Sequence, residues 1–303
     1  MKWRKNMALS KQAQDLNEKL NAIHYRQQLL AAFSQPKASD LISAIQPNRF
    51  KPNIQQKRQR LRGGQLLTLA QPANGLHKTI MMFHGGGFVL AASNAFREVA
   101  LYFVKAGFRV VIADYPLIPT VSAQALRQWA LDAYQMVQTQ EGPLIVFGDS
   151  AGANIALRLA LDLTPKQVAD SLMGLELVSL CPDLTFASAD VKARAQADLV
   201  LDRTGIKDYQ AVTMGAAGMA TFSFTQQRSW PSLGVIRIDS GANEFMVPDV
   251  ERVAAGLAKN PDNQVKVNIH PGLVHDFIMW QWLPETQATL AGMVSFFKKL
   301  DEK

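Results

Sequence analysis

Residues 143–163 read PLIVFGDSAGANIALRLALDL, and the fold prediction starts from the pattern of this segment. An apolar run of strand character meets the pattern G-x-S-x-G at 148–152, and a helical pattern follows at once. A strand, a tight turn and a helix in this order are the context in which a nucleophilic serine, here Ser150, is raised above a sheet. Because the turn is so tight, we expect strained backbone angles at Ser150 and small residues on both sides of it.

Strand and helix patterns alternate on both sides of this stretch. Strands are expected at 78–83, 108–114, 143–148, 173–180, 234–241 and 264–270. Helices are expected at 93–106, 121–139, 152–163, 249–258 and 285–300. Before them, RLRGGQLLTLA (60–70) carries a Gly-Gly turn followed by a strand pattern. Apolar strands separated by helices predict an α/β fold with a mainly parallel sheet flanked by helices.

Two segments fall outside this alternation. Residues 10–34 have the spacing of a helix, and residues 184–232 form an irregular stretch too long for an ordinary loop. We expect residues 1–303 to form a single domain. Residues 1–50 would supply a cap helix and a linker, and residues 184–232 would supply a cap insertion.

A second glycine motif, His84-Gly85-Gly86-Gly87-Phe88, follows the strand expected at 78–83. Three consecutive glycines lose much chain entropy on folding, so we expect them to turn backbone N–H groups toward a substrate. Acyl transfer needs such donors for the tetrahedral oxyanion. We assign this oxyanion hole to Gly85 and Gly86, with the N–H of Ala151. A phosphate-binding loop would instead need G-x-G-x-x-G or a Walker lysine, and neither is present.

A serine nucleophile also needs a base and an acid, in the chain order serine, acid, histidine. The base is expected after the last strand, where His275 lies in the loop PGLVHDF and His270 is the alternative. The acid is expected after the preceding strand, and Glu244 lies at that strand's tip. Asp249, which has the position of a helix N-cap, and Asp239, within the strand, remain alternatives.

The amino-acid composition indicates the class of protein and the expected cellular location. Hydrophobic residues make up 48% of the chain and charged residues 19%, which is the balance of a globular protein. Cys181 is the one cysteine, so no intramolecular disulfide forms, and a reducing, cytoplasmic location is expected. We interpret Cys181 as a core residue. No apolar region follows the basic start MKWRK, so neither a secretion signal nor a membrane span is predicted.

The net charge of +7 comes partly from one short basic stretch. Its members are Arg49, Lys51, Lys57, Arg58, Arg60 and Arg62. No aromatic platform or nucleic-acid motif accompanies them, so we interpret the stretch as a solvated edge and predict no nucleic-acid partner. No metal-ligand spacing appears either, and no cofactor is expected.

HGGGF and GDSAGAN, in this order and context, resemble the hormone-sensitive-lipase-like (bacterial esterase/lipase) branch of the α/β-hydrolase superfamily. The similarity runs from about residue 64 to 300, with weaker matches at DYPLIP (114–119) and LCPDLT (180–185). The resemblance implies an α/β-hydrolase fold with a helical cap, drawn from the N-terminus and an insertion. It implies that Ser150 is the nucleophile, His275 the base, and Gly85 and Gly86 the oxyanion loop. Where the family often has Asp-Pro-Leu at the acid, this chain has Glu244-Phe245-Met246.

These observations predict a serine carboxylesterase that hydrolyses small-molecule esters with short to medium acyl chains. Two alternatives stay open: a non-catalytic small-molecule binder on the same fold, as the plant gibberellin receptors are, and an acyl hydrolase acting on amides or thioesters. The sequence does not set the oligomeric state and leaves a homodimer open.

Overall fold

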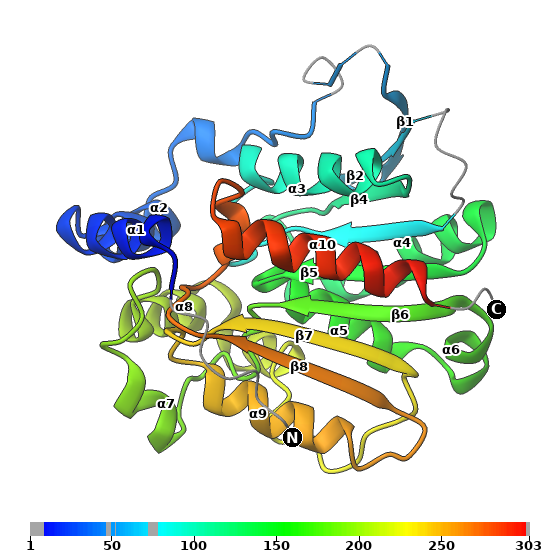
Figure 1. The fold of residues 1–303 in the computed structure, drawn as a ribbon. Coiled ribbons are helices and arrows are strands. Elements are labelled where there is room, and N and C mark those ends of the chain that lie inside the picture. The colour runs from blue at the N-terminus through cyan, green and yellow to red at the C-terminus, as the bar shows by residue number, and fades with distance from the viewer. Residues whose placement is uncertain (1–8, 47–49, 52, 72–77, 301–303) are drawn as a thin grey trace.

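The computed structural model describes residues 9–46, 50–51, 53–71 and 78–300, and eight strands of these residues form one sheet (Figure 1). The strand order across the sheet is β1-β2-β4-β3-β5-β6-β7-β8. The strands are β1 (Gln55–Leu61), β2 (Gly64–Ala70), β3 (Thr79–Phe83), β4 (Arg109–Asp114), β5 (Leu144–Asp149), β6 (Leu172–Val178), β7 (Val235–Gly241) and β8 (Gln264–His270).

The sheet is parallel from β4 to β8, while β2 pairs antiparallel with both β1 and β4. Every residue of the central strands β3, β5 and β6 is buried, as expected for strands covered on both faces. The predicted α/β fold with a mainly parallel sheet is therefore confirmed, and the Gly-Gly turn proves to close the β1–β2 hairpin.

Helices cover both faces of the sheet, and Figure 1 shows α3 and α10 in front of it with α4 and α5 behind. These helices, with α9, lie close to their predicted positions: α3 (Asn94–Lys105), α4 (Ala123–Glu141), α5 (Ala151–Asp162), α9 (Val247–Leu257) and α10 (Pro284–Lys298). The short helix α6 (Pro165–Ser171) lies between the helix expected at 152–163 and the strand expected at 173–180, and it was not predicted because proline is common just after the end of a helix. A proline also suits the first position of a helix, and a capping box between Thr164 and Gln167 starts α6 there.

The N-terminal segment forms two helices instead of the single helix predicted for 10–34. These are α1 (Lys11–Ala22) and α2 (Tyr25–Ser34), and His24 between them has left-handed backbone angles (φ 52°) that end the first helix. The short 3₁₀ helix η1 (Ala38–Leu41) follows. At the other end of α1, the backbone N–H and the hydroxyl of Ser10 donate to the carboxylate of Glu285, at 2.7 and 2.9 Å. This contact ties α1 to the first turn of α10.

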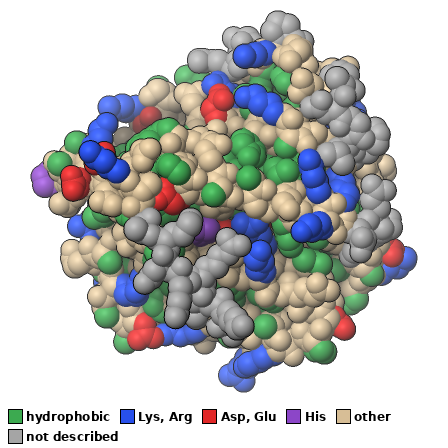
Figure 2. Space-filling model, in the orientation of Figure 1, with side chains coloured by type: hydrophobic (Ala, Val, Ile, Leu, Met, Phe, Trp, Pro, Cys, Tyr) green, Lys and Arg blue, Asp and Glu red, His purple; other side chains and the backbone are tan. Residues whose placement is uncertain are grey.

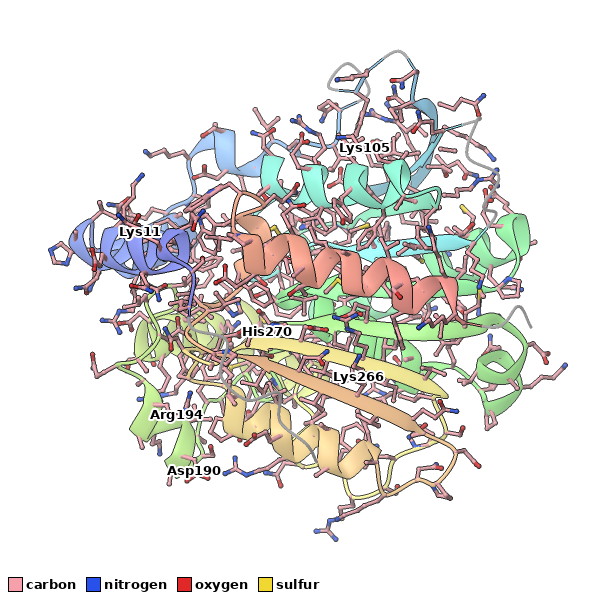
Figure 3. The ribbon with its side chains drawn as sticks, in the orientation of Figure 1. Lys11, Lys105, Asp190, Arg194, Lys266 and His270 are labelled. Atoms are coloured by element: carbon pink, nitrogen blue, oxygen red, sulfur yellow. The ribbon has the colours of Figure 1, made fainter. Side chains whose placement is uncertain are left out.

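The insertion between β6 and β7 contains α7 (Ala189–Arg194) and α8 (Arg203–Thr221). Helix α8 packs against α2, where the rings of Phe33 and Tyr209 stack with centroids 6.5 Å apart. In Figures 1 and 3 these helices gather at the end of the sheet where β8 finishes at the labelled His270. The N-terminal helices and the insertion therefore meet beyond the carboxyl ends of the parallel strands.

The basic stretch lies at the exposed edge of the sheet. Lys57, Arg58 and Arg60 on β1 are exposed, and Arg62 pairs with Asp132 at 2.9 Å. Lys and Arg side chains are spread over the face in Figure 2 instead of forming one patch, in agreement with a solvated edge. Arg49, the MKWRK start and residues 72–77 lie outside the described residues. No helix within the described ranges is long and apolar enough to cross a membrane.

The junction of β5 and α5 gives the first prediction. A Cβ added to Gly148 would stand 2.2 Å from the backbone oxygen of Gly152, so Gly148→Ala forces the backbone apart. We expect it to lower the free energy of unfolding by about 3 kcal/mol or more in urea titrations. The control is Gly292→Ala in α10, whose Cβ would meet no atom closer than 3.6 Å. It should leave stability unchanged or raise it by about 0.5–1 kcal/mol. Wild-type stability of Gly148→Ala would contradict the close packing.

Candidate active site

Ser150 lies between the end of β5 and the start of α5 with φ 50° and ψ −119°. This positive φ confirms the backbone strain predicted at the turn. The first turn of α5 also packs closely against β3, because a Cβ added to Gly152 would stand 2.1 Å from the backbone oxygen of Phe83. The N–H of Ser150 donates to the carbonyl of Val178 at 2.9 Å, which fixes the turn against β6.

Three of the predicted residues form a hydrogen-bonded chain. Ser150 Oγ is 2.9 Å from His275 Nε2, and His275 Nδ1 is 2.9 Å from Glu244 Oε2. All three side chains are buried. Each follows the carboxyl end of a different parallel strand, β5, β7 or β8, so the sheet itself brings them together.

The residues that remained as alternative base and acids do not contact Ser150 or His275 and instead form ion pairs and hydrogen bonds elsewhere. His270 Nε2 lies 2.7 Å from Asp239 Oδ1, so the alternative base and one alternative acid pair with each other. Asp239 also receives two hydrogen bonds from Arg237. Asp249 is the third residue of α9, and the predicted N-cap role is wrong because the helix begins earlier, with Met246 at the cap. Asp249 instead forms an ion pair with Arg252.

Ser179, which sequence analysis did not single out, holds the acid in place. Its hydroxyl donates to Glu244 Oε1 at 2.8 Å and accepts the N–H of Asp276 at 2.9 Å. The N–H of Gly241 donates to the same Glu244 oxygen at 2.5 Å. The strand expected at 173–180 included Ser179, whereas β6 ends at Val178, so Ser179 lies directly after the strand, at the edge where the other site residues collect.

Several carboxylates surround His275. Burial disfavours its charged form, but Asp276, Glu244 and Asp198 outweigh burial and raise the pKa of His275 to about 10. Asp276 Oδ2 lies 3.4 Å from His275 Nε2. Burial raises the pKa of Asp276 to about 7, with His275 opposing the shift and Glu244 adding to it. Neither Asp198 nor Asp276 was among the predicted site residues.

Asp198 links the insertion to the loop that carries the acid. Its carboxylate accepts the N–H groups of Val200 and Leu201 at 2.9 Å each and that of Phe245 at 3.3 Å. Phe245 directly follows Glu244, so this contact fixes the acid loop from the side of the insertion. Burial raises the pKa of Asp198 to about 6.

The glycine loop departs from its predicted use at one position. The N–H of Gly85 donates to Asp149 Oδ2 at 3.0 Å, so it is not free to face an oxyanion. The reason is the buried Asp149 of the G-x-S-x-G motif, which lies under the loop; burial raises the pKa of its carboxyl well above the usual range. Among the described residues no acceptor takes the N–H of Gly86, Gly87 or Ala151.

Two aromatic side chains fix the glycine loop from below. The Tyr115 hydroxyl donates to the carbonyl of His84 at 2.7 Å, and the two rings stack with centroids 4.1 Å apart. His84 Nδ1 donates to the carbonyl of Gly85 at 2.7 Å, and burial lowers the pKa of His84, which favours the neutral ring. The loop is therefore held rigidly before any ligand arrives.

Cys181 is buried in the core, as predicted, and burial raises the pKa of its thiol well above the usual range. The Asn154 side chain in α5 donates to the carbonyls of Cys181 and Phe222 at 2.7 Å each. This side chain joins α5 to the segment just before the insertion and to the end of α8. Within the described residues no group of histidine, cysteine or acidic side chains could hold a metal ion.

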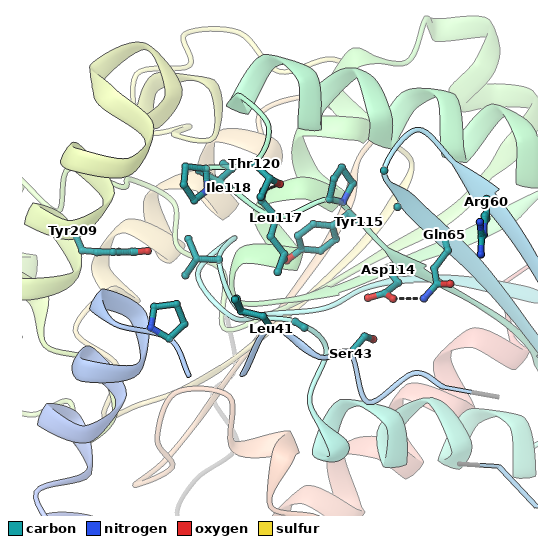
Figure 4. Close-up of a pocket in the computed structure, with 17 residues that line it drawn as sticks. Leu41, Ser43, Arg60, Gln65, Asp114, Tyr115, Leu117, Ile118, Thr120 and Tyr209 are labelled. Atoms are coloured by element: carbon teal, nitrogen blue, oxygen red, sulfur yellow. Dashed lines mark hydrogen bonds between the residues drawn. The ribbon is translucent and has the colours of Figure 1, made fainter. Parts of the chain in front are cut away.

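A cavity of about 730 Å³ lies between the β1–β2 hairpin and the loop 114–120 (Figure 4). Leu41 and Tyr209 line one part of it, while a hydrogen bond of 2.6 Å between Gln65 and Asp114 lies in another. Ser150 does not line this cavity, which is bounded by the loop 114–120 and by Val89, just after the glycine motif.

Known proteins share this sequence pattern and fold. A family model described as alpha/beta hydrolase fold matches residues 80–279, more than half of the chain. An esterase of Acinetobacter venetianus is 29% identical over 234 residues, covering 73% of this chain and 75% of that protein. Esterase LipU of Mycobacterium tuberculosis is 25% identical over 240 residues, covering 75% of this chain and 80% of that protein.

Two solved structures have the same fold. An esterase of the bacterial hormone-sensitive lipase family has a TM-score of 0.76 at 17% identity, covering 97% of this chain and 99% of that one. EstE5, soaked with p-nitrophenyl butyrate, has a TM-score of 0.76 at 20% identity, covering 96% and 99%. These findings agree with the resemblance predicted from the two glycine motifs, and the chain belongs to the α/β-hydrolase fold family.

Proposed function

We propose that this α/β-hydrolase is a serine carboxylesterase in which Ser150 is the nucleophile, His275 the base and Glu244 the acid. The observation that carries the proposal is the hydrogen-bonded chain from Ser150 Oγ to His275 Nε2 and from His275 Nδ1 to Glu244, with both contacts at 2.9 Å. A nucleophile in contact with a base that a third group orients is the arrangement acyl transfer requires. The names of the relatives, which are esterases, favour esters over amides.

The reaction proceeds in two steps. Ser150 Oγ attacks the ester carbonyl while His275 takes its proton, and the alcohol leaves with that proton. Water then attacks the acyl-enzyme in the same way and releases the acid. His275 must be neutral to act as the base, so turnover should rise with pH, while the carboxylates around it stabilise the imidazolium of the transition state.

We assign the oxyanion hole to the N–H groups of Gly86 and Ala151, with Gly87 in place of Gly85. The assignment rests on the three unpaired N–H groups and on the use of the Gly85 N–H by Asp149. Donors already held in place before the reaction stabilise the developing charge without reorganisation.

We further propose that α1, α2 and the insertion at 184–232 form a cap over the site. A Cβ on Gly87 would stand 2.8 Å from the ring of Phe33 in α2, so this helix touches the oxyanion loop directly. Arg26 of α2 also donates to the carbonyl of Ala195 in the insertion at 3.3 Å. Because Cys181 is the one cysteine, a reducing, cytoplasmic setting is part of the proposal.

The triad is tested with three variants and p-nitrophenyl butyrate. Ser150→Ala should lose turnover by about 10⁴-fold or more, and Glu244→Gln by about a hundredfold or more, with cooperative unfolding retained. The control Asp249→Asn removes another buried carboxylate and should keep turnover, although its stability falls by about 1–3 kcal/mol. Near-wild-type turnover in folded Ser150→Ala, or a larger loss in Asp249→Asn than in Glu244→Gln, would refute the assignment.

Chain-length preference is a separate prediction. We expect soluble p-nitrophenyl esters of acetate to octanoate to be hydrolysed faster than palmitate, with no jump in rate when a substrate exceeds its solubility. The reason is the composition of 184–232, which mixes charged and apolar residues and offers no strongly apolar lid for a lipid surface. A clear preference for emulsified long-chain triglyceride over soluble short esters would overturn this expectation.

A further inference from the structure

Asp276 lies beside the reacting atoms, and its charge on His275 is its only part in the proposed acyl transfer. Its Oδ2 is 3.4 Å from His275 Nε2, the atom that contacts Ser150. In the proposed reaction Nε2 passes its proton to the leaving oxygen of the ester. A side chain beside Nε2 therefore lies on the side of the leaving alcohol.

The backbone and the carboxylate of Asp276 are both unusual. Its φ of 52° lies in the left-handed region, where glycine has no strain and a side chain costs on the order of 1 kcal/mol. Oδ1 is buried and has no hydrogen-bond partner among the described residues. A buried carboxylate oxygen without a donor is unfavourable, so a group from outside the chain would supply one.

The local charges favour a cation as that group. Asp276, Glu244 and Asp198 all act on His275, the one basic side chain among them. Within the described part of the chain, no lysine or arginine forms an ion pair with Asp276. Above the pKa of Asp276, which is about 7, one imidazolium does not balance these carboxylates, so the site can accept a further positive charge.

Tyr25 lies near this carboxylate, and Trp280 packs against Tyr25. Tyr25 of α2 and Trp280 contact each other edge to face, with ring centroids 6.5 Å apart. Burial and then the charge of Asp276 raise the pKa of Tyr25, so its phenol lies within electrostatic range of the carboxylate. Aromatic faces attract organic cations, and a carboxylate beside them adds to that attraction.

We propose that Asp276, with Tyr25 and Trp280, selects esters whose leaving alcohol carries a positively charged amine or quaternary ammonium group. This inference rests on the proposed esterase function and names the substrate class of the same site. The reaction is ordinary hydrolysis: the amino-alcohol ester and water give the carboxylic acid and the free amino alcohol. A two-carbon spacer between oxygen and nitrogen places the cation beside Asp276 while the ester oxygen lies near Nε2.

The test compares two esters of the same shape. Butyrylcholine carries the ammonium, and 3,3-dimethylbutyl butyrate is its uncharged isostere; acid release from both is followed by titration. At about pH 8, Asp276, whose pKa is about 7, is mostly ionised. We expect wild-type kcat/KM for butyrylcholine to exceed that for the isostere by about tenfold, and Asp276→Asn to bring the ratio near one. The ratio cancels any change in His275 that affects both esters alike.

Two further variants keep the test decisive. Asp276→Gly removes the side chain where glycine is unstrained, so it should fold and also lose the preference. Asp170→Asn removes the same charge from the exposed surface of α6 and should keep the wild-type ratio. An unchanged ratio in Asp276→Asn, even with a shifted pH profile, would overturn the inference and leave the esterase standing. Hydrolysis of neither ester by the wild type would overturn the proposed function as well.

Discussion

The close approach of β5 and α5 at Gly148 and Gly152 is the constraint on which the rest of the site depends. No Cβ fits at either position, since it would stand 2.2 Å or less from backbone atoms. This packing forces Ser150 into a positive φ and leaves its hydroxyl above the sheet, at the start of a helix whose first N–H groups are free. The strained backbone of Ser150 is maintained because the residue before it belongs to the buried strand β5 and the residue after it belongs to the buried helix α5.

Several acidic side chains near this turn are buried. Glu244 and Asp198 are completely buried, and each accepts backbone N–H groups that offset part of the loss of solvation. Asp198 belongs to the insertion and contacts the N–H of Phe245, so the segment proposed as the cap also stabilises the loop of the acid. Movement of the insertion would therefore change the environment of His275 together with access to Ser150.

Sequence patterns predicted the features that repeat along the chain or depend on one tight turn. The parallel sheet and the turn at Ser150 follow from apolar spacing and small residues, which act locally. Side-chain directions are not local, so the pattern could not show that Asp149 takes the N–H of Gly85. The apolar spacing runs through His24, and only its backbone angles reveal the break between α1 and α2. Asp276 directly follows His275 in the sequence, but the pattern could not show the left-handed backbone angle at Asp276 or the approach of its carboxylate to His275 Nε2.

The central claim is that Ser150 is the one activated nucleophile of this site. Diethyl p-nitrophenyl phosphate measures it directly, since an activated serine oxygen displaces p-nitrophenol and keeps the diethylphosphoryl group. We expect one such group per chain by intact-protein mass spectrometry, located on Ser150 by peptide mapping and absent from folded Ser150→Ala. A folded wild-type protein that stays unlabelled, or that carries the group on another residue, would contradict it.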